Sequence, residues 1–550
     1  MKVIIDGKPL QCAPTDAIAE GGEAMVFDLH DGRVLKLWKP PHHADFAHDP
    51  ALQAQATLRI AQYGAKLAAL PANLVTTAPQ LVVPLSVCRD QASNAIVGFA
   101  MAKVDGVLLH SLSEPRSWQT TGFDGARRVA ILRSLHQALC AAHRAGFIIG
   151  DFNDLNVVVD GTTARLIDVD SFGFGPWPAT MFSERFVDPR LLQRSATGVA
   201  LVGHHDRASD WFAYCVMVVR VLLGTSPWGG VWSPTDPAAR CTPSERLLRR
   251  ISIFTPGVIY PRAAQRISTL PSAMETHLCA VFAGTVPASF PAALLDVLTY
   301  ATCPVCGQNH ARTVCTCGAA APARPVSVNT SAVQATLIDR ASITTLVERV
   351  TATPSRSSGV WLRDQAIWRQ RGVREERIAT LLAHQSMVWA NHTNGVGLYR
   401  AGGFTVGLLF RTNAGLAREI TGLPSLRGQI IEAHAAITDA SAWLTVVTAS
   451  QGVVRTHLLV VHERDGLLAY HDVSDAAWAV GLAGSAAIEH NLYVPTDEGV
   501  VRLGLHGNQL TVEREFPQTA TYVNAASRLT FDQRGLITIS EQGAFALSLR

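Results

Sequence analysis

Apolar and polar residues alternate in short runs over the first hundred positions of the chain. Two apolar runs, at residues 24–29 and 34–38, flank polar and glycine residues at 30–32, which predicts a hairpin. Between residues 50 and 70 apolar side chains recur every three or four positions, a spacing typical of a helix. Strand-like runs return between residues 81 and 102. The pattern predicts a small sheet that carries one helix.

From residue 125 to about residue 300 the apolar positions follow a helical period instead. Val129, Leu132 and Leu135 fall on one face of a helix that should end ahead of Gly146. We therefore expect a mainly helical lobe to follow the small sheet.

Beyond about residue 350 the pattern is almost entirely strand and turn, with alternating apolar residues bounded by Asn, Asp and Gly. Glycines next to strand-like runs recur loosely, at Gly359, Gly395, Gly452, Gly499 and Gly543. Their spacing is close to the ~40–50 residues of a four-stranded propeller blade, and the length of the region fits about four or five such blades. A β-sandwich, or two small β domains, is the alternative that the same weak repeat allows.

The composition is that of a protein with large cores. Of the 550 residues 48% are hydrophobic and only 17% are charged, so extensive disorder is not expected. A formal net charge of +3 is close to neutral for this length, and it predicts neither a nucleic-acid partner nor a membrane surface as partner. No stretch of ~18 uncharged apolar residues occurs, and the first residues do not resemble a signal peptide. We expect a soluble, cytoplasmic protein.

Two glycines near residue 20 and a lysine one strand later form the first candidate site. Gly21 and Gly22 lie in a turn between two strands and are followed by Val26, as in the glycine-rich loops that cover nucleotide phosphates. Lys36 stands in the next apolar strand, where a cation could hold the α- and β-phosphates. Each signal is weak alone, because hairpin glycines and solvated strand lysines are common.

Two acidic motifs follow in the helical part. Asp151 and Asn156 are spaced as D-x-x-x-x-N, directly after a predicted helix. Asp168 comes after a Leu-Ile pair in the segment 166–172, where a metal-binding aspartate would follow a strand. An aspartate near a turn is by itself often a capping residue. Phosphoryl transfer needs a triphosphate that is positioned and neutralised by metal and lysine, and these residues supply those parts in order.

Together these motifs resemble a bacterial protein-kinase-like family with an I-G-D-x-N-x-x-N catalytic loop and an L-I-D-x-D-S-F metal motif. The likeness covers about residues 10–320. It implies a two-lobed α+β protein kinase fold over residues 1–300 and an ATP-dependent protein serine/threonine kinase. Members of the family are often encoded beside a von Willebrand A protein and a PP2C-type phosphatase, as in tellurium-resistance-associated phosphorylation triads. The resemblance thus implies a protein substrate, with these two proteins as candidate partners.

The resemblance also implies roles for single residues, which should converge on one cleft. The ligands implied are Gly21, Gly22, Val26 and Lys36 for ATP, and Asn156 and Asp168 for magnesium. Asp151 would be the catalytic base, which orients the attacking hydroxyl and accepts its proton, and Lys36 would also act in catalysis. Asp210 resembles the buried aspartate that anchors a catalytic loop from the large central helix.

Three departures from the kinase pattern bear on activity. Ile149 and Gly150 replace the usual His-Arg, so activation by phosphorylation of a loop is not expected. The helix expected at residues 50–70 contains no Asp or Glu that could pair with Lys36. Arg190 stands where an anchoring glutamate is usual. Because catalysis depends on the lysine–glutamate pair, a pseudokinase scaffold that binds nucleotide without transferring phosphate is the alternative.

A cluster of cysteines follows the helical part. Two pairs supply the four thiolates of a tetrahedral structural zinc site, namely Cys303, Cys306, Cys315 and Cys317. The second pair is C-x-C, a tighter loop than C-x-x-C, and His310 is the reserve ligand. A redox pair is the alternative. We expect a zinc ribbon over residues 301–320.

A run of Ala, Pro and Ser after the cysteines predicts a linker over residues 321–350. The expected domains are therefore a kinase-like domain (1–300), the zinc ribbon, this linker and an all-β propeller-like domain (351–550). The β domain holds no cysteine and no cluster of nucleophile, base and orienting acid, so we expect it to recognise partners rather than to catalyse. Its removal should then leave ATP binding intact.

Overall fold

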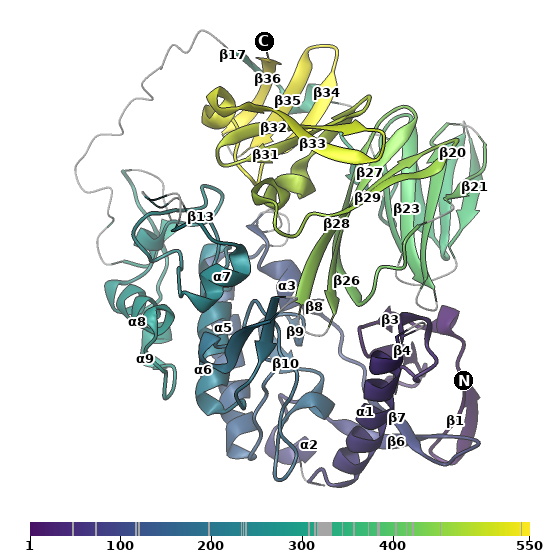
Figure 1. Ribbon diagram of the computed structural model, residues 1–550, viewed down its shortest axis with the longest axis vertical. Coiled ribbons are helices and arrows are strands. Elements are labelled where there is room, and N and C mark those ends of the chain that lie inside the picture. Colours follow the sequence, from purple (N-terminus) through teal and green to yellow (C-terminus); the bar gives the residue numbers. More distant parts are fainter. Residues whose placement is uncertain are drawn as a thin grey trace. The chain divides into compact units, whose positions relative to one another are not determined.

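The computed structural model describes most of the chain (Figure 1). The residues outside the description are 47–48, 72–73, 116–117, 119–121, 196–197, 233, 235, 237–238, 306–308, 313–314, 316–332, 344, 356–357, 372, 382–385, 402–403, 414, 421–422, 451–452, 541 and 550. Cys306, Cys317, Gly452 and the first part of the expected linker therefore lie outside the described residues.

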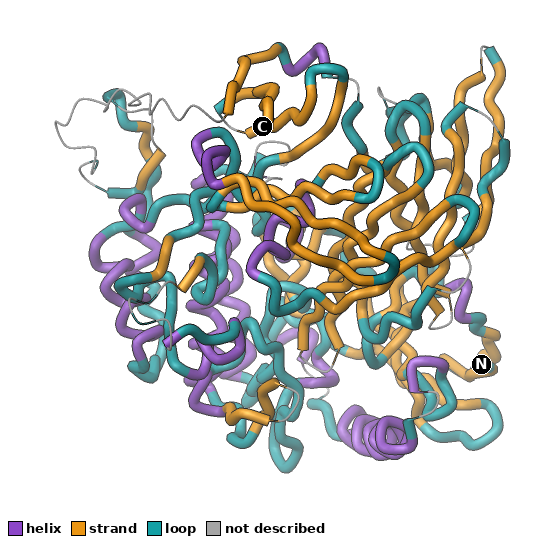
Figure 2. Tube along the Cα trace, turned by 45° about the horizontal axis from the view of Figure 1, so that its top comes forward, coloured by secondary structure: helices purple, strands orange, loops and turns teal. Residues whose placement is uncertain are grey.

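Two compact units make up the chain, and each combines separate stretches of sequence. The first unit contains Met1–Ala61, Val87–Phe99 and Asn329–Arg550, and the second contains Gln62–Ser86 and Ala100–Val328. Strands predominate in the first unit and helices in the second (Figure 2). The prediction of several domains, with a mixed α/β N-terminal region and a β-rich C-terminal region, is thus confirmed.

A seven-stranded sheet contains the N-terminal strands, in the order β2-β1-β6-β7-β5-β4-β3. These strands are β1 (Lys2–Ile5), β2 (Lys8–Gln11), β3 (Ala19–Glu20), β4 (Ala24–Asp28), β5 (Arg33–Trp38), β6 (Pro84–Asp90) and β7 (Ile96–Ala102). The predicted hairpin joins β4 to β5. Its turn is closed by the Asp28 carboxylate, which accepts a hydrogen bond from the backbone N–H of His30 at 2.8 Å. The predicted helix follows as α1 (Pro50–Ala68).

The C-terminal β region begins before residue 350. β17 (Val333–Ile338), which falls within the expected linker, pairs with the last strand, β36 (Gly543–Leu549). The pairing runs from Val333 opposite Leu549 to Ile338 opposite Ala544, so the start and the end of the region share one sheet.

Five antiparallel sheets form this region in the part of the chain that the structure describes. The first three are β17-β36-β35-β34, with β34 (Arg528–Asp532) and β35 (Gly535–Ser540); β19-β20-β21, from β19 (Val360–Arg363), β20 (Ala366–Arg371) and β21 (Arg374–Thr380); and β18-β22-β23-β24-β25, from β18 (Glu348–Arg349), β22 (Ser386–Ala390), β23 (Asn394–Ala401), β24 (Phe404–Arg411) and β25 (Arg418–Ile420). The other two are β26 to β29 (Gln429–Ile437, Ser441–Ser450, Val453–His462 and Gly466–Asp472) and β30 to β33 (Ala486–Ile488, Asn491–Thr496, Gly499–His506 and Gln509–Phe516).

Neighbouring sheets share apolar layers, and β27 shows how the sequence produces them. Its residues from Ala442 to Thr448 are all buried, as in a strand covered on both faces. Leu444 packs in one core with Trp389 of the preceding sheet, whereas Trp443 packs in another with Leu492 of the following sheet. Because successive side chains point to opposite faces, one apolar run contributes to two cores.

The recurring glycines of this region serve two different purposes. Gly359, Gly499 and Gly543 have φ of +65°, +119° and +138°, which favours glycine. Gly395 lies inside β23, where a side chain would overlap the ring of Phe410 on the paired strand. The loose repeat therefore mixes turn glycines with one required by close packing.

The second unit is built around two long helices, α5 (Gly125–Arg144) and α6 (Arg207–Leu223). Its remaining elements are α2 (Leu74–Thr77), α3 (Leu109–Leu112), α7 (Pro243–Leu248), α8 (Ser272–Ala283), α9 (Ala293–Asp296), the sheet of β8 (Val107–Leu108), β9 (Val157–Asp160) and β10 (Thr163–Leu166), and the hairpins of β11 (Leu192–Ser195) with β12 (Gly198–Leu201), β13 (Val231–Trp232) with β14 (Val258–Ile259) and β15 (Ala301–Thr302) with β16 (Asn309–His310). No helix among the described residues combines the length and apolarity needed to cross a membrane.

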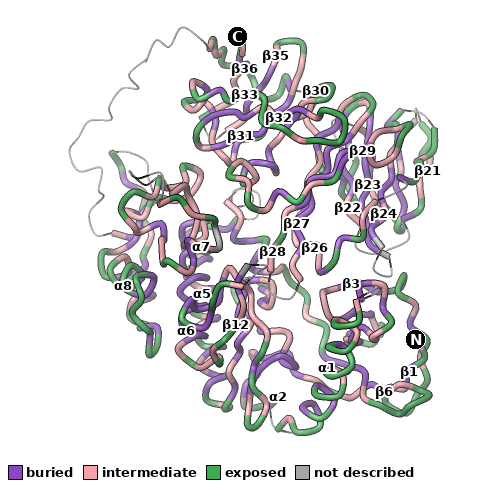
Figure 3. Tube along the Cα trace, viewed as in Figure 1, coloured by how far each residue is buried: buried purple, intermediate pink, exposed green. Residues whose placement is uncertain are grey.

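α6 is buried along nearly its whole length and forms the centre of the main core of this unit (Figure 3). It begins with a capping box, in which the Asp206 side chain accepts from Ser209 N and the Ser209 hydroxyl accepts from Asp206 N. It ends at Gly224, whose φ of +68° is left-handed. Both ends of the helix are thus defined by side-chain and backbone geometry, which fixes the position of Asp210 in its first turn.

We expect Gly224→Ala to destabilise the second unit more than Gly161→Ala. Both glycines have positive φ, which costs a residue with a side chain about 1–2 kcal/mol. A Cβ at Gly224 would also lie 2.5 Å from Cγ of Pro115, whereas a Cβ at Gly161 meets nothing within 4 Å. Overpacking of this kind adds about 1–3 kcal/mol. Thermal unfolding followed by helical circular dichroism measures the difference, and equal midpoints for the two variants would contradict it.

Candidate functional site

The loop between α5 and β9 carries the first group of predicted site residues, and α6 holds its backbone. The Asp210 carboxylate accepts hydrogen bonds from the backbone N–H of Ile149 (2.9 Å) and of Gly150 (2.8 Å). Nε2 of His143, near the end of α5, lies 2.9 Å from the same carboxylate. Asp210 has no exposed surface, so these contacts replace the water that its charge would otherwise bind.

Gly150 is required by the shape of this loop. Its φ is +73°, and a Cβ would lie 2.5 Å from the Cβ of Ala179. The arginine of the usual His-Arg pair cannot be accommodated in this conformation without moving its neighbours. The departure noted in the sequence is therefore part of the loop's own geometry.

Asp151, Asn153 and Asn156 are brought together by hydrogen bonds within the loop. Nδ2 of Asn153 donates to Oδ1 of Asp151 at 2.8 Å, which orients the predicted catalytic carboxylate. Nδ2 of Asn156 donates to the backbone carbonyl of Asp151 at 3.0 Å. Asn153 is the x-N of the I-G-D-x-N motif, and the sequence analysis gave it no role of its own.

Asp168 lies at the same end of the β9–β10 hairpin as Asn156. Strand pairing continues one step beyond β10, because the backbone N–H of Ile167 donates to the carbonyl of Asn156 at 3.0 Å. Asp168 itself has a left-handed backbone (φ +70°), uncommon for a residue other than glycine, and its carbonyl accepts from the Ser171 hydroxyl at 2.8 Å. Asn156 and Asp168 thus supply an amide and a carboxylate from adjacent backbone positions.

Asp154 is a buried residue of this loop that the sequence analysis did not single out. Its carboxylate lies 2.8 Å from Nε of Arg220 on α6 and 3.4 Å from Nδ1 of His110 on α3. Burial by itself raises the pKa of Asp154, but the charges of Arg220 and His110 lower it below its ordinary value. The sequence feature that could have indicated such a buried acid is Arg220, a charged residue within the apolar second half of α6.

Asp188 is a second residue missed from the sequence. Arg190 was noted in place of an anchoring glutamate, yet the buried carboxylate is supplied two residues earlier. Asp188 lies 2.7 Å from Nε of Arg190 and 3.4 Å from Nη2 of Arg250. An ion pair therefore anchors this segment with an aspartate as its acid.

The predicted nucleotide residues of the first unit lie on the β3–β4–β5 strands. Val26 and Lys36 are direct cross-strand partners, so their side chains share one face of the sheet. They are half-buried, whereas Phe27 and Leu35 beside them point into the core. Nζ of Lys36 lies 5.7 Å from the centre of the Phe99 ring. Gly21 closes the turn, because its N–H donates to the carbonyl of Ala24 at 2.8 Å.

Lys39, just beyond β5, is the fully buried lysine of the first unit. Its Nζ lies 2.8 Å from Glu20 and 2.6 Å from Asp45. No motif in the sequence distinguishes Lys39 from a solvated lysine, so its burial is visible only in the structure.

The cysteine-rich segment places three candidate metal ligands together. The ligand atoms of Cys303, His310 and Cys315 lie within 4.8 Å of one another. β15 pairs with β16, and Ala301 lies opposite His310. This pairing places the histidine near Cys303, which follows β15 directly. The backbone N–H of Val305 donates to the Cys303 sulfur at 3.4 Å, a contact that favours a thiolate. Two sulfurs and an imidazole are a group that could hold zinc, and His310, the reserve ligand expected from the sequence, is one of the three.

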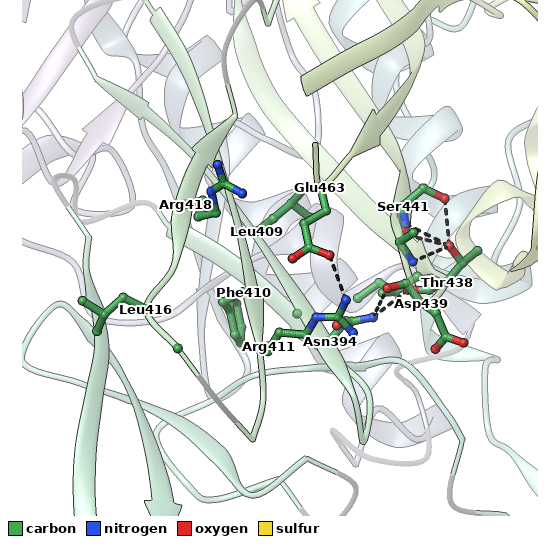
Figure 4. Close-up of a pocket in the computed structure, with 14 residues that line it drawn as sticks. Asn394, Leu409, Phe410, Arg411, Leu416, Arg418, Thr438, Asp439, Ser441 and Glu463 are labelled. Atoms are coloured by element: carbon green, nitrogen blue, oxygen red, sulfur yellow. Dashed lines mark hydrogen bonds and ion pairs between the residues drawn. The ribbon is translucent and has the colours of Figure 1, made fainter. Parts of the chain in front are cut away.

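A cavity of about 230 Å³ lies in the β region, where turns of two neighbouring sheets meet (Figure 4). Its wall includes Arg411, whose Nη2 lies 2.8 Å from Glu463, and Asn394, whose amide donates to the carbonyls of Thr438 and Asp439. Leu416 adds an apolar surface. The cavity thus combines charged and amide side chains with an apolar wall, a mixture that suits the binding of a ligand.

Comparison of the sequence with protein-family models and with curated proteins finds no match.

We expect the purified chain to carry about one zinc ion per molecule, with Zn–S distances of ~2.3 Å. Cys303→Ser and Cys315→Ser should each lower the zinc content, because a hydroxyl is a poor replacement for a thiolate ligand. Elemental analysis measures the content, and Cys279→Ser, at an exposed cysteine, is the matched control.

His310→Ala tests the composition of the ligand set. Loss of an imidazole ligand should make zinc removable by a chelator that leaves the wild type loaded. Retention of zinc as tight as in the wild type would assign that position to a thiolate and exclude His310 from the site.

Proposed function

We propose that this protein is an ATP-dependent serine/threonine protein kinase that transfers the γ-phosphoryl group of ATP to a hydroxyl of a protein partner. The observation that carries the proposal is the loop of residues 147–156. Its backbone is held by Asp210, its Asp151 carboxylate is oriented by Asn153, and Asn156 lies beside the segment that ends in Asp168.

Each residue has a stated part in the proposed reaction. Asp151 orients the substrate hydroxyl and accepts its proton as the hydroxyl oxygen bonds to the γ-phosphorus and the bond to the β-phosphate oxygen breaks, which leaves ADP. Lys36 holds the phosphates of the nucleotide, with Gly21, Gly22 and Val26 around it. ATP supplies the phosphoryl group when bound, and magnesium neutralises its charge.

The residues present fit a magnesium ion. Asn156 donates through Nδ2 to the Asp151 carbonyl, which leaves its amide oxygen for a cation. Together with the Asp168 carboxylate this oxygen makes a hard ligand set, the kind that Mg²⁺ prefers.

The N-terminal sheet supports a kinase-like fold for residues 1–300. A hairpin with a glycine turn is followed by the strand of Lys36, a helix and two further strands, and the order β3-β4-β5-β7-β6 within the sheet places Lys36 next to the hairpin. The β1–β2 hairpin lies at the other edge, beside β6.

For the C-terminal region we propose a propeller-like domain that recognises protein partners. Its successive antiparallel sheets of three to five strands and the pairing of β17 with β36 support radial repetition, in which the first strand completes the last sheet. The cavity beside Arg411 and Glu463 is a candidate recognition site. A von Willebrand A protein and a PP2C-type phosphatase are the partners to test first.

A nucleotide-binding pseudokinase scaffold is the second candidate, and one observation favours it. α1 contains no carboxylate along its 19 residues, so it offers Lys36 no acidic partner. Kinases use such a pair to hold the lysine on the phosphates.

Transfer of radiolabelled phosphate from ATP in the presence of magnesium distinguishes the two candidates. Asp151→Asn should lower the transfer rate about 100- to 10,000-fold, the usual contribution of a general base, while nucleotide affinity stays near that of the wild type. Asp168→Asn should in addition weaken magnesium-dependent nucleotide binding. Asp160→Asn, an exposed carboxylate at the β9–β10 turn, is the matched control and should behave as the wild type.

Wild-type protein that binds ATP but transfers no more phosphate than Asp151→Asn, with the candidate partners present, would establish the scaffold. Absence of ATP binding in the wild type would exclude both candidates.

A further inference from the structure

A buried lysine, Lys39, binds the backbone of the glycine turn between β3 and β4. Nζ of Lys39 donates to the carbonyl of Gly21 at 2.6 Å, and it contacts Glu20 at 2.8 Å and Asp45 at 2.6 Å. The Gly21 carbonyl and the Asp45 carboxylate accept hydrogen bonds from this ammonium group, and Glu20 forms an ion pair with it. Any change at either carboxylate therefore acts on the hydrogen bond to Gly21.

The C-terminal β region supplies the second cation of this cluster. Arg400 of β23, 355 residues after Asp45, donates to the other oxygen of that carboxylate and to the carbonyl of Gly428. Its Nε lies 4.0 Å from Glu20. Arg400 and Asp45 are both buried and both belong to the first unit. The chain of contacts thus runs from Arg400 through Asp45 and Lys39 to the backbone of the glycine turn.

The charges of the cluster balance only when Arg400 is present. Glu20 and Asp45 are matched by Lys39 and Arg400. His43, beside them, has its pKa lowered to about 4 by burial and by the charge of Lys39, so it is neutral near pH 7. Removal of one partner from a buried ion pair leaves an uncompensated charge, which a buried cluster tolerates poorly.

The glycine turn and the β region also pack closely around this cluster. A Cβ at Gly22 would lie 4.0 Å from Cα of Gly428 and 3.9 Å from the carbonyl oxygen of Ala449. The cavity left beside them is about 20 Å³, little more than one water molecule. Arg427 adds an ion pair with Asp49 at 3.3 Å, but both side chains are partly exposed.

We propose that Arg400 is a positioning residue for the nucleotide site, which sets the conformation of the glycine turn from the β region. The proposal rests on the kinase function proposed above. Without Arg400, Lys39 is the sole cation for two buried carboxylates, and its ammonium is drawn away from the Gly21 carbonyl. The turn loosens, so nucleotide binds less tightly, whereas the loop of Asp151 is untouched. On this proposal ATP binding depends on the β region, in contrast to the expectation from the sequence.

The test uses the full chain and measures the affinity of magnesium–ATP by calorimetry, together with KM for ATP and kcat. Arg400→Met should raise Kd and KM about tenfold, within the usual range of coupling between sites, and leave kcat within about twofold. Arg427→Met is the matched control, because it removes a partly exposed arginine that links the same two parts of the unit, and it should bind ATP as the wild type does.

Two further variants separate positioning from folding. Arg400→Lys keeps the charge and should recover part of the affinity. Asp45→Asn combined with Arg400→Met leaves Lys39 paired with Glu20, so one cation again matches one carboxylate. The double variant should therefore bind ATP no more weakly than Arg400→Met alone. Additive losses in the double variant would contradict an action of Arg400 through Asp45.

The outcomes distinguish this proposal from the function on which it rests. Wild-type protein without ATP binding removes the proposed function. If the wild type binds ATP and Arg400→Met binds it with the same affinity, the positioning role is overturned and the proposed function stands. The same holds if Arg400→Met and Arg427→Met lose ATP affinity to the same extent. If Arg400→Met does not fold, Arg400→Gln replaces it, because glutamine keeps a polar side chain but removes the charge, and an ATP affinity equal to that of the wild type in Arg400→Gln overturns the positioning role.

Discussion

The contact on which the second unit's site depends is the buried carboxylate of Asp210. A charge without exposed surface is costly unless directed hydrogen bonds replace water, and here the donors are two consecutive backbone N–H groups and His143. These donors belong to the loop and to α5, whereas Asp210 belongs to α6. The loop therefore has one conformation that satisfies the carboxylate, and its other side chains are placed by that conformation.

The placement extends from the backbone to the chemistry in short steps. Gly150 permits the left-handed turn that brings its N–H to Asp210, and the Asp151 side chain then meets Asn153. Asp154, one residue further, is fixed to α6 by Arg220. Asn153 and Asp154 thus hold the loop, and Asp151 and Asn156 serve the candidate site, so four polar residues lie within six positions.

In the first unit, too, buried charged side chains fix the conformation of the backbone around them. Lys39, Asp45 and Arg400 add little net stability by themselves, since desolvation offsets most of the attraction between buried ions. Their value lies in geometry, because the two oxygens of Asp45 accept separately from Lys39 and from Arg400. A segment near residue 40 and a strand near residue 400 are thereby held in one arrangement.

The sequence by itself determined which local elements form and which residue types carry chemistry. The helical period of α5, the apolar run of β5, the turn at residues 30–32 and the spacing from Asp151 to Asn156 are set by neighbouring residues, so they can be recognised in the sequence. Only the tertiary structure decided that Lys39 is buried while Lys36 is half-exposed, and that β17 pairs with β36. It also decided that the buried carboxylate of the segment around Arg190 is Asp188, two residues earlier. The Asp188–Arg250 contact and the pairing of β17 with β36 join residues far apart in the sequence. A charge in a sequence does not show whether its partner will be water or another buried group.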